Sequence, residues 1–177
     1  MSDLKLLIKL KTPSVLSINQ KIIPKSIDLP LIEGVHQLKL RNNAFGKKEV
    51  FDFIRKKWVA FQPEEMVRQA LVKYLAELPG FSLARMAVER GVKGSNTRKR
   101  FDVLVYDYAL QPFILVECKA PEVVLNEETF QQVSWYNHNI QAPYYVLTNG
   151  ATTYCCGVDH QQKRISFLSE IPTLVSK

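Results

Sequence analysis

One short segment combines an acid and a lysine in a way that could do chemistry. In the apolar run Phe113-Ile-Leu-Val-Glu117-Cys118-Lys119, which is typical of a β-strand, Glu117 and Lys119 are two residues apart. Side chains at that spacing leave the same face of a strand, so Cys118 is expected to point into the packing on the other face. The same acid-x-lysine pattern occurs at Asp3-Leu-Lys5. The apolar strand distinguishes Glu117, because a charge at the edge of a core usually has a partner or a function.

Asp102 is the expected partner of this pair. The apolar runs Phe101–Tyr108 and Phe113–Lys119 are separated by four residues, which is typical of a hairpin. A turn centred near residues 109 to 110 sets Asp102 opposite Glu117 or Lys119. Two facing carboxylates with open water positions suit Mg²⁺, or Mn²⁺. From the spacing alone, the favoured alternative is an ordinary ion pair between Asp102 and Lys119, with Glu117 in solvent.

The flanking segments predict the elements that position these residues. Pro63 at a first helical position, followed by Glu64 and Glu65 at the positive end of the helix dipole, predicts a helix that ends before Pro79-Gly80. A second helix is expected over Asn126–Ile140, with Asn126 as its N-cap. The remaining expected extended segments are Met86–Glu89, Tyr144–Leu147, Tyr154–Val158 and Ile165–Leu168. This order predicts an α/β fold with a mixed sheet flanked by helices.

The N-terminal part differs in charge. Residues 1 to 60 hold 12 Lys/Arg against 5 Asp/Glu, so the whole net charge of +7 lies there. We interpret residues 1–50 as a β-rich basic extension packed on the core, with strands over residues 4–10 and Val35–Leu40, and residues 51–177 as the main domain. A second basic segment contains Arg98, Lys99 and Arg100. Such patches attract phosphate backbones, although they also serve as solubilising charge.

Several functional classes are excluded or disfavoured. No run approaches the roughly 18 apolar residues of a transmembrane helix, so we expect no membrane span. Three cysteines without a C-x₂-C spacing indicate a reducing compartment, and therefore the cytoplasm. No G-x-x-x-x-G-K-[ST] phosphate loop is present. Trp58, beside Arg55, Lys56 and Lys57, is either a core residue or a side chain that stacks on a nucleic-acid base.

The combined motifs carry a family resemblance over about residues 48 to 172. They are Phe51-Asp52 with Arg55-Lys56-Lys57, Pro63-Glu64-Glu65-Met66-Val67-Arg68-Gln69, Arg100-Phe101-Asp102, Val116-Glu117-Cys118-Lys119-Ala120-Pro121 and Thr148-Asn149-Gly150. Together they resemble the PD-(D/E)XK nuclease superfamily, and more closely the N-terminal domain of type I restriction enzyme R subunits in a stand-alone form. Phe101 stands where the name-giving proline would be.

The resemblance implies a restriction-endonuclease-like core, Mg²⁺-dependent phosphodiester hydrolysis and DNA as the substrate. It implies Asp102, Glu117 and Cys118 as the metal set and Lys119 as the catalytic lysine. It also implies a helix carboxylate, which the sequence leaves open between Glu64 and Glu65. The residues expected to contact DNA are Gln132 and Tyr136, four apart on one helical face, with Arg98, Lys99 and Arg100.

A different class of function remains open. The chain is either a metal-dependent deoxyribonuclease or a non-catalytic module that binds DNA or a protein and has kept the nuclease fold. Full restriction R subunits contain an ATP-driven motor. This sequence has no phosphate loop of such a motor, so we expect no translocation by this polypeptide alone. A motor or a specificity subunit could act in trans, and the sequence leaves the oligomeric state open.

Overall fold

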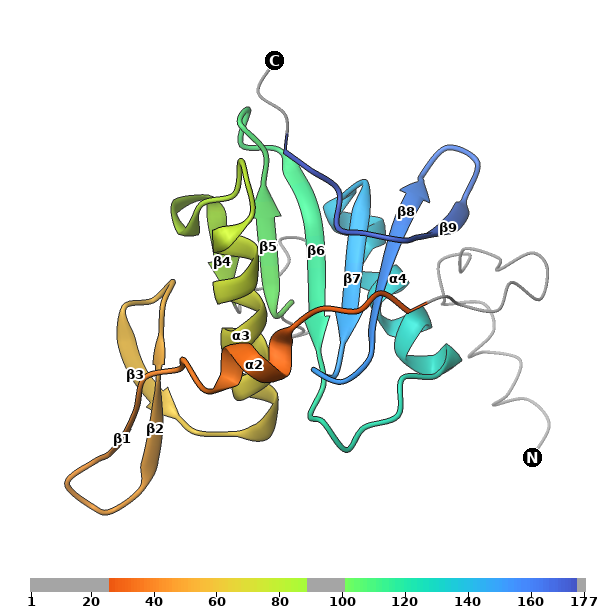
Figure 1. Ribbon diagram of the computed structural model, residues 1–177. Helices are drawn as coiled ribbons and strands as arrows, with labels where there is room; N and C mark the ends of the chain where they lie inside the picture. The colour runs from red at the N-terminus through yellow and green to blue at the C-terminus, as the bar shows by residue number, and fades with distance from the viewer. Residues whose placement is uncertain (1–25, 89–100, 175–177) are drawn as a thin grey trace, which may run out of the picture.

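A computed structural model describes residues 26–88 and 101–174 (Figure 1). Within this part of the chain a six-stranded sheet has the order β4-β5-β6-β7-β8-β9, and a separate three-stranded sheet has the order β1-β2-β3. The strands are β1 (Leu40–Asn42), β2 (Lys48–Asp52), β3 (Lys57–Ala60), β4 (Met86–Val88), β5 (Val103–Tyr106), β6 (Pro112–Cys118), β7 (Tyr144–Thr148), β8 (Thr153–Asp159) and β9 (Arg164–Leu168). The helices are α2 (Leu31–Val35), α3 (Pro63–Glu77), the 3₁₀ turn η1 (Leu83–Arg85) and α4 (Glu127–Ile140).

The hairpin β5–β6 has the expected register. Val103 pairs with Val116 and Leu104 with Leu115 in antiparallel fashion, so Asp102, just before β5, faces Glu117. The Asp107 carboxylate accepts hydrogen bonds from the backbone of Ala109 and Gln111 and so stabilises the turn. Strand β6 is parallel to β7, and the chain between them passes through α4. The expected α/β class with a mixed sheet is therefore confirmed.

Helix α3 covers one face of the six-stranded sheet. It begins at Pro63, as predicted, and its buried apolar residues pack with Val103, Val116 and Cys118 in one core cluster. Each fully buried Val or Leu side chain in this cluster contributes roughly 1.5–3 kcal/mol when it leaves water. The buried apolar residues of the helix are Val67, Ala70, Leu71, Val72 and Leu75.

Helix α4 covers the opposite face. The Asn126 side chain accepts a hydrogen bond from the backbone N–H of Thr129, and the Thr129 hydroxyl accepts one from the backbone of Asn126, which forms a capping box. Phe130 and Val133 belong to a second core cluster with Leu115. The sheet thus lies between two helices, an arrangement compatible with a restriction-endonuclease-like core.

The prediction of a strand over Val35–Leu40 is wrong. Helix α2 occupies Leu31–Val35, and β1 begins only at Leu40. The helix forms because Leu31 is buried in the core cluster that contains the apolar residues of α3, and Gly34 lies against Ala70 of that helix. These tertiary contacts override the local alternation of apolar and polar residues.

The small sheet extends across the expected boundary at residue 50, because β2 and β3 continue it to Ala60. It is fixed to α3 by the side-chain oxygen of Gln69, which accepts a hydrogen bond from the backbone N–H of Phe53 at 3.1 Å. The expected strand over residues 4–10 lies outside the described residues. Among the described residues no helix is both long and apolar enough to cross a membrane.

Candidate active site

Residues from four elements meet at one end of the six-stranded sheet. Asp102 precedes β5, and Glu117 and Lys119 lie at the end of β6, so the antiparallel pairing brings them together. Figure 1 shows this end, where the β6 arrow finishes, beside the N-terminal half of α3. Glu64 comes from the first turn of α3, and Gln132 comes from α4 on the other side of the sheet.

Lys119 and Glu117 form an ion pair with each other. The distance from Lys119 Nζ to Glu117 Oε1 is 2.8 Å, and Lys119 Nζ also donates to Gln132 Oε1 at 3.3 Å. The amide nitrogen of Gln132 donates to the same Glu117 oxygen at 3.4 Å. Since Glu117 is 7% exposed, the alternative in which Glu117 lies in solvent while Lys119 pairs with Asp102 does not describe this structure.

Asp102 is held differently from Glu117. Its Oδ2 atom accepts a hydrogen bond from the backbone N–H of Cys118 at 2.6 Å, and its Oδ1 atom lies 3.4 Å from Arg68 Nη2. It is 8% exposed. The neighbouring strand and helix α3 therefore fix the two Asp102 oxygens separately.

Burial and mutual repulsion make the acids weak. Burial, followed by the charge of Glu117, raises the pKa of Asp102 to about 7, although Arg68 opposes the shift. Burial likewise raises the pKa of Glu117, against the hydrogen bond from Lys119. Burial alone would lower the pKa of Lys119, but the hydrogen bond and charge of Glu117 raise it above its ordinary value. The pair of carboxylates thus favours either a proton or an added cation, while Lys119 stays protonated.

The two acids at the start of α3 have different surroundings. Glu65 is buried, and it bonds with Gln69 Nε2 at 2.8 Å and with Arg68 Nη1 at 3.1 Å. Glu64 has a side chain 45% exposed, and its charge raises the pKa values of both Asp102 and Glu117. Of these two acids, Glu64 is the one whose charge acts on Asp102 and Glu117.

A chain of alternating charges continues from this cluster to the small sheet. Asp52, which is fully buried, bonds with Arg55 Nε at 2.5 Å, and Arg55 Nη2 lies 3.6 Å from Glu65 Oε2. Glu65 in turn pairs with Arg68, which reaches Asp102.

Arg68 was not among the site residues expected from the sequence. Its signal was the spacing of Arg68 three and four residues after Glu65 and Glu64 on one helix.

The donor atoms at this site are hard oxygens. Carboxylate oxygens of Asp102 and Glu117 are the ligand type that Mg²⁺ or Mn²⁺ prefers, and burial raises the pKa of both acids even though Arg68 and Lys119 lie beside them. The Cys118 thiol lies in the core on the other face, and burial raises its pKa well above the ordinary value, so only its backbone reaches the site. Within residues 26–88 and 101–174, no three acidic, His or Cys side chains are grouped as ligands of one ion. The residues present fit an ion that keeps several waters.

Several of the side chains expected to contact DNA fall outside the part of the chain that the structure describes. Arg98, Lys99 and Arg100 lie outside the described residues, as does the side chain of Tyr136. Of the expected pair Gln132 and Tyr136, the structure describes the side chain of Gln132, which lies in the cluster and accepts a hydrogen bond from Lys119.

Comparison with known proteins adds one match. Residues 63–172 match the family model described as type I restriction enzyme R protein N terminus. The matched range runs from α3 to just beyond β9 and includes the whole cluster at the end of the sheet. No curated protein matches the chain.

Proposed function

Because this chain belongs to the family of type I restriction enzyme R protein N termini, we propose that it hydrolyses phosphodiester bonds of DNA with a divalent cation, Mg²⁺ or Mn²⁺. The observation that carries the proposal is the facing pair of buried carboxylates, Asp102 and Glu117, with the Lys119 ammonium 2.8 Å from Glu117. An unrelated buried ion pair would need only one acid. Here a second acid is held beside it at a cost in free energy.

Asp102 and Glu117 would hold the ion. When bound, such an ion lowers the pKa of a water molecule and stabilises negative charge on a phosphoryl oxygen. Asp102 would keep its orientation through the backbone N–H of Cys118. The partly exposed Glu64 would add negative charge at the open side of the cluster.

Lys119 would orient the attacking water and stabilise charge that develops on the phosphate. Its hydrogen bonds to Glu117 and Gln132 fix the ammonium group from both sides. Its raised pKa keeps it protonated at neutral pH, which favours these roles over removal of a proton from water. Gln132 would act as a positioning residue through Lys119.

A non-catalytic module that binds DNA or a protein is the second candidate, and one contact favours it. The guanidinium of Arg68 lies 3.4 Å from Asp102 Oδ1, so a built-in cation already compensates part of the acidic pair. A subunit that supplies a motor or sequence specificity in trans is compatible with either candidate.

Titration calorimetry with Mn²⁺ tests the proposed ion site. We expect wild-type protein to bind the ion and Asp102→Asn to bind it at least tenfold more weakly, because a carboxylate ligand is lost. The matched control is Glu170→Gln, which removes an exposed acid beyond β9 and should titrate like wild type. Equal affinity in all three proteins, or no binding to the wild type, would favour the binding module.

A further inference from the structure

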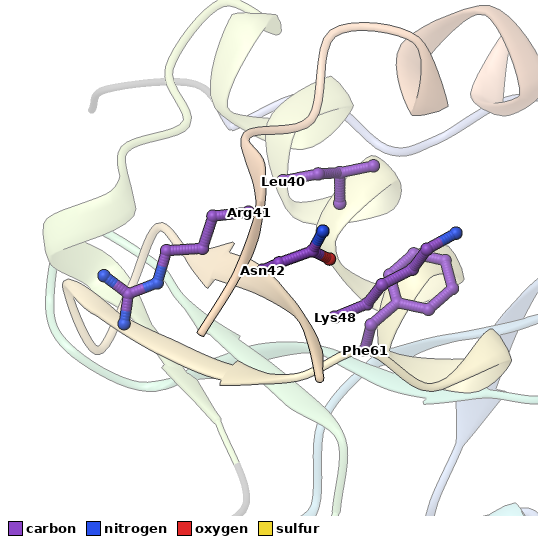
Figure 2. Close-up of a pocket in the computed structure, with 5 residues that line it drawn as sticks. All are labelled: Leu40, Arg41, Asn42, Lys48 and Phe61. Atoms are coloured by element: carbon purple, nitrogen blue, oxygen red, sulfur yellow. The ribbon is translucent and has the colours of Figure 1, made fainter. Parts of the chain in front are cut away.

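The three-stranded sheet β1–β3 has two unlike faces. On β2, Val50 and Asp52 are fully buried on the side that meets α3, whereas Phe51 between them is partly exposed on the other side. The register sets Phe51 opposite Trp58 and Arg41 opposite Glu49, so these four side chains share the outer face. Figure 2 shows Arg41 pointing away from its neighbours Leu40 and Asn42, as alternation requires.

The outer face combines flat aromatic rings with cations. The Arg41 guanidinium lies 4.4 Å from the centroid of the Trp58 ring, and Lys39 Nζ lies 5.5 Å from the centroid of the Phe51 ring. The Phe51 and Trp58 rings pack edge to face, with 5.4 Å between their centroids. Glu49 Oε2 accepts from Arg41 Nε at 2.7 Å, and 47% of the Arg41 side chain is still exposed. A planar cation is thus held in place on top of an indole ring.

The charge of this region selects the class of partner. Residues 39 to 57 contain seven Lys or Arg and only two Asp or Glu, and one of these acids, Asp52, is buried against Arg55. A polyanion complements such a surface. Flat faces of aromatic rings and guanidinium groups add affinity for a second flat group, and every residue of a nucleic acid pairs such a group, its base, with a phosphate.

We propose that the outer face of β1–β3 binds single-stranded nucleic acid, with an unpaired base stacked on the Arg41 guanidinium above Trp58. Strands of this length offer room for about two bases, as on other sheet surfaces that stack nucleotides. Lys39 would contact the adjacent phosphate. A duplex hides the faces of its bases, so it could use only the charge of this surface.

The small sheet is connected to the acidic cluster, but the nucleic-acid binding proposed for it does not depend on the proposed hydrolysis. The charged chain from Asp52 through Arg55, Glu65 and Arg68 connects the small sheet with Asp102. This connection leaves from the buried side of the small sheet, whereas the bound nucleic acid would lie on the outer face. Binding to it needs neither a metal ion nor cleavage.

Fluorescence anisotropy of labelled oligonucleotides, in the presence of a chelator, tests the proposal. The probes are a 12-residue oligothymidine, an abasic strand with the same number of phosphates, and a 12-base-pair duplex. Arg41→Gln is compared with Lys48→Gln, which removes the same charge from the opposite side of β1–β3. We expect oligothymidine to bind the wild type best and Arg41→Gln to weaken it about tenfold.

The control should show only the loss of charge. Lys48→Gln should weaken oligothymidine and the abasic strand by the same small factor, whereas Arg41→Gln should weaken oligothymidine more than the abasic strand. Equal losses in the two variants, equal wild-type affinity for the two strands, or tighter binding of the duplex would overturn the proposal. Phe51→Leu, which keeps apolar bulk but removes a ring, provides a second variant, and thermal midpoints confirm that each protein is folded. Because no ion is present, failure here would leave the proposed hydrolysis untouched.

Discussion

At the scale of single residues, Lys119 is the side chain whose role is easiest to isolate. Lys119→Met should lower the rate of DNA cleavage by about 10²- to 10⁴-fold, because a positioned charged group would be lost from the transition state. Affinity for Mn²⁺ should remain, since Asp102 and Glu117 are intact. Single-turnover cleavage of a short duplex and calorimetry on the same preparation provide the two readouts.

The control for this change is Lys163→Met, which removes an exposed lysine from the turn between β8 and β9. It should cleave at the wild-type rate. If Lys119→Met cleaves as fast as this control and differs only in stability, Lys119 is a structural partner of Glu117 and the catalytic assignment is wrong.

The acidic pair predicts how stability depends on pH. The pKa of Asp102 is raised to about 7, above an ordinary value of about 3.9, so between these two values the folded state keeps a proton that the unfolded state has lost. The free energy of unfolding contributed by Asp102 should therefore fall as pH rises from about 4 through about 7. The raised pKa of Glu117 acts in the same direction.

Urea unfolding at pH 5 and pH 8, with a chelator present, measures this effect. Asp102→Asn should lose less stability than the wild type between the two pH values, because the amide does not ionise. An identical pH dependence in both proteins would mean that the pKa of Asp102 is not raised in the folded state by burial or by the charge of Glu117.

At the scale of elements, Arg68 on α3 connects the two sheets through buried charges. Arg68→Met should destabilise the protein by about 3–5 kcal/mol, because it leaves Glu65 and Asp102 without their shared cation. Lys73→Met on the same helix is the control, since it removes an exposed pair with Glu77 that contributes less than about 1 kcal/mol. Similar urea midpoints for the two variants would show that the chain of charges contributes little.

Most of the main elements could be predicted from local signals. Pro63 with two acids identified the start of α3, and Asn126 identified the start of α4, because caps and helix dipoles act within one turn. The hairpin register followed from the length of the turn, and it set Asp102 opposite Glu117. The strand expected over Val35–Leu40 failed because burial of Leu31 against α3 is a contact distant in sequence.

The composition of the site was only partly predictable for the same reason. The pattern Glu117-x-Lys119 identified a strand pair, but the contact of Arg68 with Asp102 joins a helix and a strand 34 residues apart. The choice between Glu64 and Glu65 depended on the rotation of α3, which the apolar stripe did not decide. The packing of α3 turns Glu65 towards Gln69 and leaves Glu64 partly exposed.

At the scale of the whole molecule, three regions divide the work that we propose. The acidic cluster lies at one end of the six-stranded sheet. Helix α3 holds the buried ion pair of Glu65 and Arg68 between this cluster and the small sheet, and β1–β3 presents a basic aromatic face. Figure 1 shows the small sheet beside α3, at the end of the main sheet where β6 finishes. A nucleic-acid strand held on the outer face of the small sheet would lie on the side of that sheet that faces away from α3.

The most direct test of this account is the rate at which purified protein converts supercoiled plasmid to open circles in the presence of Mg²⁺ or Mn²⁺. We predict that the wild type nicks the plasmid, that a chelator stops the reaction, and that Glu117→Gln is at least 10²-fold slower because it loses a carboxylate ligand. Glu170→Gln should nick like the wild type. A wild-type protein that nicks with neither ion, or a Glu117→Gln protein that nicks at the wild-type rate, would contradict the assignment of this cluster as a nuclease site.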